Sequence, residues 1–256
     1  MSHPDRTVSS QCQSPIALTS ETDNFLQSAE LYDAIYHFKN YQRESERLRS
    51  LIDRTVPGAR TLLDVACGTG EHARFLKQYY AVDGIDLNNS YIEAARAKNP
   101  SGKYRCADMR DLDLETSYDV VTCLFSAIGY VKTVESAERA IACMARHVRP
   151  GGSLIVEPWL PPSLWKPGAV SINTGETKDG LVCRMALSRR EDNLSVISLH
   201  YLHGTRQGVS YHTEQLELGL FTEEQMLHSF QVAGMSVVFK PEGLIGRGLY
   251  IGLFSP

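Results

Sequence analysis

Short apolar runs alternate with helical hydrophobic patterns through the middle of the chain. Runs without helical spacing, which predict strands, occur at residues 61–65, 81–85, 103–106, 119–124 and 153–157. Helical spacing follows after residue 70 and across residues 90–98 and 134–147. This alternation predicts a parallel sheet that is covered by helices on both faces.

Beyond residue 159 the pattern changes from alternating elements to strands alone. Pro161, Pro162 and Pro167 interrupt any regular element. Four strand-like runs then follow without helices between them, at residues 169–174, 181–188, 194–203 and 209–218. We predict that they form an antiparallel sheet inserted into the fold. A helix over 222–233, with Thr222 as its cap, and strands at 236–240 and 249–254 would close the chain, with the last strand antiparallel to the rest.

Together these patterns predict an α/β fold with a Rossmann-like, seven-stranded, mostly parallel sheet and an antiparallel insertion. The region before the first strand is polar to about residue 23 and then carries two helical patterns with Tyr32, Tyr36 and Tyr41 near them. We therefore divide the chain into a mobile tail (1–23), a helical lid (24–58), the core (59–159 with 219–256) and the insertion (160–218).

The sequence LLDVACGTGEH, at residues 62–72, joins the first strand to a glycine loop and a helix start. Gly68 and Gly70 allow close approach of the backbone to a ligand, and the helix start offers amide groups to an anion. The loop fits a dinucleotide site with Asp86 on the ribose. However, Asp64 would repel a pyrophosphate, whereas it suits the amino group and sulfonium of S-adenosylmethionine (SAM).

The strand predicted at residues 103–106 is also followed by an acidic residue. Asp108 can accept a hydrogen bond from an adenine amine, and Met109 can lie on the ring. Acidic residues at three successive strand ends favour a SAM site, with a nicotinamide-dependent oxidoreductase as the alternative. Aromatic rings of the lid, such as Tyr32 and Tyr41, would attract a sulfonium.

Composition narrows the possible partners. The formal charge of −4 in 256 residues argues against nucleic acid, and 43 % hydrophobic residues suffice for a packed core. The six cysteines have no metal spacing and predict reduced thiols in a cytoplasmic protein. We expect no signal peptide, no membrane span and no metal site; His200 and His203 would face opposite sides of a strand.

The chain resembles the class I SAM-dependent methyltransferases and, more narrowly, the bacterial dTDP-amino sugar N-methyltransferases. The motifs that carry this resemblance are ELYD at 30–33, LLDVACGTG at 62–70, ADMRD at 107–111, LFSAIGY at 124–130, EPW at 157–159, LFT at 220–222 and GRGL at 246–249. The glycine loop is typical of the whole superfamily, whereas the motifs FS, EPW and GRG indicate a much narrower family. The sequence departs from the family pattern on the acceptor side, at Asn24-Phe25, Leu160, Leu244 and Ile245.

The resemblance implies SAM as the methyl donor, an insertion that covers the active site, and two sets of contacts. The donor contacts would be Tyr32, Tyr41, Ala66, Gly68, Asp86, Asp108, Met109, Leu124 and Phe125, to which we add Asp64, Gly70 and Leu87 from the loop and strand ends. The acceptor contacts would be Ser126, Tyr130, Trp159 and Arg247. Arg247 would grip a diphosphate or cap the final hairpin.

Methyl transfer from a sulfonium chiefly needs alignment of the reacting atoms. We therefore predict catalysis by approximation, with Tyr130 and Glu157 orienting the amine or taking its proton through water. Glu157 could equally be a structural carboxylate paired with an arginine. The expected acceptor is a small molecule, most closely a dTDP-amino sugar of natural-product biosynthesis, and the alternative is another small hydroxyl, thiol or peptide-like acceptor. We also consider a homodimer.

Overall fold

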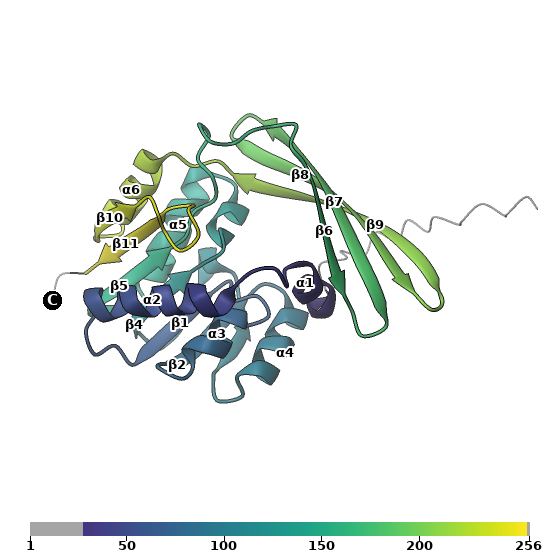
Figure 1. The fold of residues 1–256 in the computed structure, drawn as a ribbon. Helices are drawn as coiled ribbons and strands as arrows, with labels where there is room; N and C mark the ends of the chain where they lie inside the picture. Colours follow the sequence, from purple (N-terminus) through teal and green to yellow (C-terminus); the bar gives the residue numbers. More distant parts are fainter. Residues whose placement is uncertain (1–27, 255–256) are drawn as a thin grey trace, which may run out of the picture.

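The computed structural model describes residues 28–254, and within them seven strands form the predicted mostly parallel sheet (Figure 1). Its strand order is β10-β11-β5-β4-β1-β2-β3. The bounds are Thr61–Val65 (β1), Ala81–Asp86 (β2), Tyr104–Cys106 (β3), Tyr118–Cys123 (β4), Val148–Val156 (β5), Ser236–Lys240 (β10) and Leu249–Leu253 (β11). β11 runs antiparallel to both of its neighbours, β5 and β10. The predicted fold class is confirmed.

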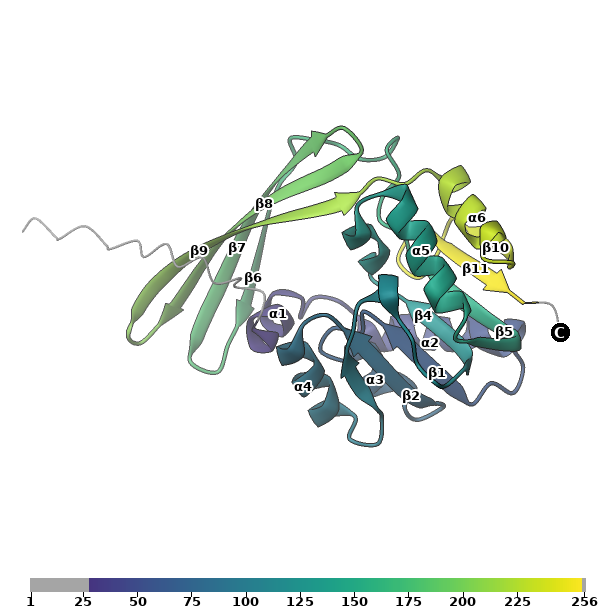
Figure 2. The ribbon, with the colours of Figure 1, turned by 180° about the vertical axis from the view of Figure 1, so that it is seen from behind.

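Helices cover both faces of this sheet, as the alternation of strands and helices predicts. The helices α2 (Tyr41–Thr55), α3 (Glu71–Leu76) and α4 (Asn89–Lys98) share one hydrophobic cluster, whereas α5 (Val134–Ala145) and α6 (Glu223–Val232) lie in a second cluster on the other face (Figures 1 and 2). Successive strand residues point to opposite faces, so Leu62 packs into the first cluster and Leu63 into the second.

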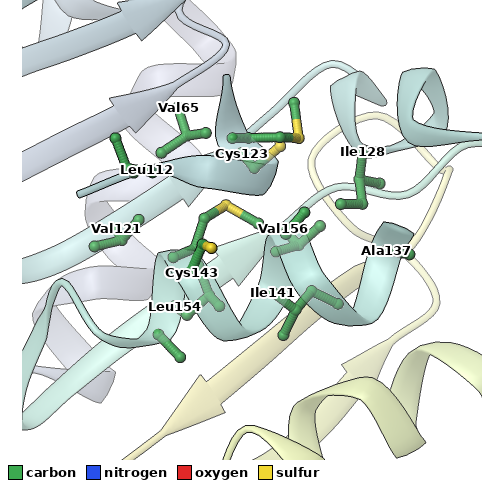
Figure 3. Close-up of a cluster of buried hydrophobic side chains, with 14 of the residues drawn as sticks. Val65, Leu112, Val121, Cys123, Ile128, Ala137, Ile141, Cys143, Leu154 and Val156 are labelled. Atoms are coloured by element: carbon green, nitrogen blue, oxygen red, sulfur yellow. The ribbon is translucent and has the colours of Figure 1, made fainter. Parts of the chain in front are cut away.

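The packing against α5 shows why the fourth and fifth strands are so apolar. Ile141 of α5 and Val121 and Leu154 of the sheet are all fully buried in the same cluster (Figure 3). Burying an aliphatic side chain of this kind stabilises the fold by about 1.5–3 kcal/mol. This core fixes the carboxyl ends of β1 and β4, where the strand order reverses. Open α/β sheets bind ligands at such a reversal.

The insertion is a separate antiparallel sheet with the strand order β6-β7-β8-β9 in the described chain. Its strands are Val170–Glu176 (β6), Gly180–Glu191 (β7), Leu194–Thr205 (β8) and Gly208–Gly219 (β9). Helix α1 (Ala29–Ile35) packs against β6 and β7, and it lies between the inserted sheet and α4 (Figure 1). The core, α1 and the inserted sheet therefore enclose space at the carboxyl edge of the parallel sheet.

The sequence predicts the start of α6 correctly and places the start of α4 one residue too late. Thr222 caps α6 in a reciprocal capping box with Gln225, as the sequence pattern indicates. Helix α4, which the pattern predicts from residue 90, starts one residue earlier, because the Asn88 side chain caps it and accepts the Ser90 N–H at 2.9 Å. The predicted tail at residues 1–23 lies outside the described residues.

Candidate active site

A cavity of about 1140 Å³ lies between the strand ends and the inserted sheet. Residues from α1 and α2, from the carboxyl ends of β1, β2 and β4, and from the inner face of the inserted sheet all line it. Typical small-molecule sites measure roughly 300–1000 Å³. The cavity therefore has room for two reactants side by side.

Asp64 places a buried carboxylate on the wall formed by β1. The side chain is 2 % exposed, and Thr122 donates a hydrogen bond to Oδ1 at 2.9 Å. The second oxygen, Oδ2, has no hydrogen-bond partner. Burial raises the pKa of Asp64 to about 6. An unpartnered, buried acidic oxygen beside a cavity suits a ligand that brings a cationic donor group.

The two loop glycines serve different purposes. Gly68 lines the cavity at φ +55°, and a Cβ placed on it would meet no atom within 4 Å, so it faces open space. Gly70 does not line the cavity; with φ +78°, its added Cβ would come within 2.9 Å of Ala95 Cβ. Gly70 is therefore needed for the turn and for packing on α4, and its contact with the donor stays a prediction.

Asp86 is the last residue of β2 and lines the cavity, as Asp64 does. Its carboxylate accepts the backbone N–H groups of Gly68 and Asn88, both at 2.9 Å, and keeps lone pairs for a ligand hydroxyl. Leu87 beside it is 63 % exposed and lines the cavity. Burial raises the pKa of Asp86 above its usual range. The position suits the ribose of a nucleoside.

Asp108 behaves differently from the other two strand-end acids. Its carboxylate accepts hydrogen bonds from the side chain and backbone of Arg110, and it is not among the residues that line the cavity. Arg110 lowers the pKa of Asp108. Its neighbours Ala107 and Met109 do line the cavity, with Met109 buried. The expectation of three carboxylates facing one crevice therefore holds for two, and the contact of Asp108 with adenine stays a prediction.

Aromatic rings surround the space in front of this wall. The Tyr32 ring centroid lies 4.6 Å from that of Tyr36 and 5.0 Å from that of Tyr91, and Tyr36 meets Phe125 edge-on at 5.2 Å. All four residues and Tyr41 line the cavity. Such a belt attracts a sulfonium by about 0.5–2 kcal/mol per ring.

Two residues shortly after the carboxyl end of β4 have an unfavourable backbone conformation. Phe125 and Ser126 have φ angles of +52° and +63° and line the cavity next to Leu124. Glu157 supports this turn, because its Oε2 accepts the Phe125 N–H at 2.7 Å. Ala66, at the end of β1, has φ +56° and also lines the cavity. Strained backbone that the surroundings hold in place is typical of functional sites.

Glu157 itself does not reach the cavity. It is fully buried, its Oε1 has no hydrogen-bond partner, and burial raises its pKa. Its role as an orienting group or proton acceptor stays a prediction. From its hydrogen bond we infer that Glu157 positions Phe125.

This assignment predicts different outcomes for two substitutions of Glu157. Glu157→Gln keeps an acceptor for the Phe125 N–H, so we expect kcat to stay within about fivefold of the native value. Glu157→Ala removes that acceptor and should cost about 1–3 kcal/mol of unfolding free energy, with a larger loss of kcat. Chemical denaturation and initial rates measure both effects. Equal loss of kcat in the two variants would restore the proton-acceptor role.

A buried charged cluster beside the donor wall escaped the sequence analysis. Glu44 Oε2 contacts His72 Nε2 at 2.9 Å and also accepts a hydrogen bond from Lys39 Nζ. The Lys39 Nζ lies 4.4 Å from the centroid of the Phe125 ring. Although burial pushes the pKa of Glu44 up, the hydrogen bonds from His72 and Lys39 hold it below its usual range. These residues are far apart in sequence, and no local pattern marks them.

The four predicted acceptor residues all line the cavity, and Arg247 contacts two of the others. Arg247 donates to Ser126 Oγ at 3.1 Å, and its guanidinium carbon lies 5.1 Å from the Trp159 ring centroid. The Trp159 indole N–H donates to Ser195 Oγ at 2.8 Å, which ties it to β8. Tyr130, on the 3₁₀-helix η3 (Ala127–Val131), is 51 % exposed and lines the cavity. Burial of its hydroxyl raises its pKa well above the usual range.

The comparisons with known proteins agree with this geometry. A methyltransferase-domain family profile matches residues 62–152. The chain is 41 % identical, over 88 % of its length and 90 % of the relative, to the dTDP-3-amino-3,6-dideoxy-alpha-D-glucopyranose N,N-dimethyltransferase of Streptomyces fradiae. It is 33 % identical, over 88 % of its length and 97 % of the relative, to the dTDP-3-amino-3,4,6-trideoxy-alpha-D-glucopyranose N,N-dimethyltransferase of Streptomyces venezuelae.

Solved structures give the same result. DesVI of Streptomyces venezuelae superposes with a TM-score of 0.83 at 31 % identity, over 89 % of this chain and 98 % of that one. SAM-bound CalS10, an amino pentose methyltransferase of Micromonospora echinaspora, superposes with a TM-score of 0.80 at 31 % identity, over 88 % and 97 %.

The fold, the strand-end site and these relatives define a class I SAM-dependent methyltransferase. Within that class, the chain belongs to the family of the dTDP-amino sugar N-methyltransferases. The family resemblance that the motifs indicate is confirmed, and the alternative of a nicotinamide-dependent oxidoreductase is wrong. No helix between residues 28 and 254 is long and apolar enough to cross a membrane. In the same span, no group of three His, Cys, Asp or Glu side chains could hold a metal ion.

Proposed function

We propose that this enzyme transfers methyl groups from SAM to the amine of a dTDP-linked amino sugar. The observation that carries the proposal is one cavity with a carboxylate wall at Asp64 and Asp86 and an arginine, Arg247, among its lining residues. The names of the relatives supply the acceptor class, because three of them are dTDP-amino sugar N,N-dimethyltransferases. The setting would be the biosynthesis of a natural product such as an antibiotic.

SAM supplies an electrophilic methyl group on a positively charged sulfur. Asp64 would bind the amino group of the donor, Asp86 its ribose, and Met109 its adenine. The aromatic belt of Tyr32, Tyr36 and Tyr91 excludes water and favours the positive sulfur. These groups hold the donor still, and such positioning can supply roughly 7–11 kcal/mol of the barrier.

The acceptor would enter beside Arg247 and lie under the inserted sheet. Arg247 would bind the diphosphate bidentately, with Ser126 and Trp159 fixing its side chain. Tyr130 would face the sugar from the 3₁₀-helix η3. The enzyme then acts chiefly by aligning the amine, the methyl group and the sulfur in a cavity from which water is excluded.

An acceptor panel tests this function. Purified enzyme, SAM and the dTDP-3-amino sugar named for the Streptomyces fradiae relative should give N-methylated products detectable by mass spectrometry. The same amino sugar without dTDP should react at least about a hundredfold more slowly in kcat/KM, because it lacks the group that Arg247 binds. Phenols and thiols should not react. Turnover of a neutral phenol with no turnover of any dTDP-amino sugar would overturn the proposal.

We also propose that the enzyme is a homodimer that associates through the outer face of the inserted sheet. This face exposes Val170, Ile172, Leu181, Met185, Leu187, Leu202 and Val209 at 41–66 % of their surface. Ile172 pairs with Met185, and Val170 with Leu187, so the apolar side chains are neighbours on one face. Contiguous exposed apolar patches of this kind commonly mark interfaces, and a two-fold dimer would bury the same patch twice.

The dimer proposal predicts that charge on this face separates the subunits. Met185→Glu combined with Leu202→Glu should weaken self-association at least about a hundredfold, because the carboxylates would lose water on association. Val232→Glu on α6, at a residue that is 61 % exposed, serves as the matched control and should leave the dimer intact. Sedimentation equilibrium measures the mass of each. A monomeric native protein, or a doubly substituted protein that still dimerises, would contradict the proposal.

We place the enzyme in the cytoplasm. The five cysteines of the described chain, Cys67, Cys106, Cys123, Cys143 and Cys183, are all free thiols, as is usual in a reducing compartment.

A further inference from the structure

The inserted sheet contributes one carboxylate to the cavity lining, together with apolar side chains and the cation Arg184. Ala186, Ile197, Leu199 and Leu216 line the cavity from this sheet, and Glu214 of β9 stands among them. We propose that Glu214 binds the acceptor as an ammonium ion and takes up one of its protons, so that the neutral amine can attack. The inference rests on the proposed function and deepens it.

Among the described residues, five carboxylates line the cavity: Glu44, Asp64, Glu71, Asp86 and Glu214. The first four belong to the donor side, on α2, β1, α3 and β2. On that side Glu44 pairs with Lys39, and Glu71 pairs with Lys98 at 2.6 Å. Glu214 is the member of this group that belongs to the inserted sheet. It is therefore the carboxylate placed to meet the acceptor, since Glu157 lies outside the lining residues.

The strand register fixes where Glu214 stands. Glu214 pairs with Leu199 on β8, and Leu199 pairs with Ala186 on β7, so the two neighbours of Glu214 in this row of the sheet are apolar. The Tyr201 hydroxyl donates to Glu214 Oε2 at 3.5 Å. This contact steadies the carboxylate, and an ionised carboxylate has about four lone-pair sites, so it can still receive an ammonium N–H.

The groups that face Glu214 come from several elements. Besides Tyr201 on β8, they include Tyr91 of α4 and Tyr130 of η3, which line the same cavity. Burial raises the pKa of Tyr130, and the charges of Tyr36, Asp86 and Glu214 raise it further.

Two further charged or titratable groups lie on the side of Glu214 that faces α1. Arg184 of β7 donates to the Tyr36 hydroxyl at 3.0 Å and to Asn173 Oδ1 at 2.8 Å, and it pairs in register with Tyr201. His212 precedes Glu214 by two residues on β9 and also pairs with Tyr201. Arg184 and His212 therefore lie in the next register row on the same face of the sheet as Glu214.

Methyl transfer to the amine needs a group that accepts a proton. Alkyl amines are largely protonated at neutral pH, and an ammonium nitrogen has no lone pair with which to attack. In the proposed step, one N–H bond breaks and its proton joins the Glu214 carboxylate, which leaves the electron pair on nitrogen. That pair then forms the new C–N bond while the methyl–sulfur bond breaks and its electrons return to sulfur. Glu214 afterwards releases its proton to water, and the product ammonium can repeat the cycle for a second methyl group.

A pH series on three variants tests the proton transfer. In Glu214→Gln only the amine that is already neutral in solution can react, so kcat/KM with the dTDP-amino sugar should fall about tenfold for each pH unit below the amine pKa. The loss relative to native enzyme should be large at pH 7 and should shrink above that pKa. Glu214→Asp should retain most of the native profile. Glu217→Gln, on the same strand but paired with Lys132 outside the cavity, is the matched control. A loss that does not change with pH would overturn the inference.

A second measurement uses the native enzyme alone. With S-adenosylhomocysteine bound, calorimetry at pH 7 should show that the dTDP-amino sugar binds about ten- to a hundredfold more tightly than the same sugar with a hydroxyl in place of the amine. The preference should vanish above the amine pKa. Equal affinities at pH 7 would overturn the inference even if Glu214→Gln fails to fold. If the native enzyme methylates no dTDP-amino sugar at all, the proposed function fails instead.

Discussion

Replacing Arg247 with alanine should raise the KM for the dTDP-amino sugar by about a hundredfold, since the loss of one partner of a buried charge pair costs roughly 2–5 kcal/mol. The guanidinium donates to Ser126 Oγ and lies over Trp159, so it is held in one orientation before the acceptor arrives. The affinity for SAM should stay within about threefold, because the donor contacts at Asp64 and Asp86 are untouched. Initial rates at saturating SAM, with calorimetry for SAM binding, separate the two effects.

Arg247→Lys provides the matched control. Lysine keeps the charge but loses the planar fork of donors, so its acceptor KM should lie between those of the native enzyme and the alanine variant. Free dTDP should inhibit the native enzyme and should inhibit the alanine variant far more weakly. If the KM for SAM rises as much as that for the acceptor, Arg247 caps the final hairpin and does not hold the diphosphate.

Replacing Asp64 with asparagine should have opposite effects on stability and on donor binding. The pKa of Asp64 is raised to about 6 by burial, so the folded state binds protons more tightly there than the unfolded chain does. Stability is therefore lost as pH rises from about 4 to about 6, and at pH 7 the ionised group costs about 1–3 kcal/mol. The neutral amide of Asp64→Asn would remove this cost, and the ligand-free variant should melt at a higher temperature. Its affinity for SAM should fall about ten- to a hundredfold, because the amino group loses a charged acceptor.

Asp119 gives the matched control at the opposite edge of the sheet. Its carboxylate accepts the Arg60 and Thr61 N–H groups at 2.8 and 2.9 Å, and these and other hydrogen bonds outweigh burial and lower its pKa. Asp119→Asn should therefore lose stability at pH 7 and leave the SAM affinity unchanged. Calorimetry should also show that native SAM affinity weakens below about pH 6, as Asp64 becomes protonated. An Asp64→Asn protein that binds SAM normally would remove Asp64 from the donor site.

The sequence predicts the fold well where a local pattern is repeated. Runs such as 119–124 are mostly apolar and lack helical spacing, as is typical of strands buried between two layers of helices. The loss of helical spacing after Trp159 is equally local, and it predicts the inserted sheet. The donor wall follows from the same logic, because residues at the carboxyl ends of parallel strands meet at one edge.

The side-chain contacts of the site could not be predicted from the sequence. They depend on the direction in which each side chain points, and packing between distant parts of the chain determines that direction. Glu157 ends a core strand like Asp64, but it turns beneath Phe125 and not toward the cavity. Asp108 turns to Arg110, a neighbour that the motif places beside it without fixing their contact. Glu214 was missed because strand alternation gives two faces but does not say which one covers the cavity.

A structure with S-adenosylhomocysteine and the dTDP-amino sugar both bound tests the central claim most directly, which is that one cavity holds both reactants. We predict the homocysteine amine at Asp64, the ribose at Asp86, the diphosphate at Arg247, and the sugar amine under the inserted sheet, directed at the sulfur. A sugar nucleotide bound outside this cavity, with its amine remote from the sulfur, would contradict the account.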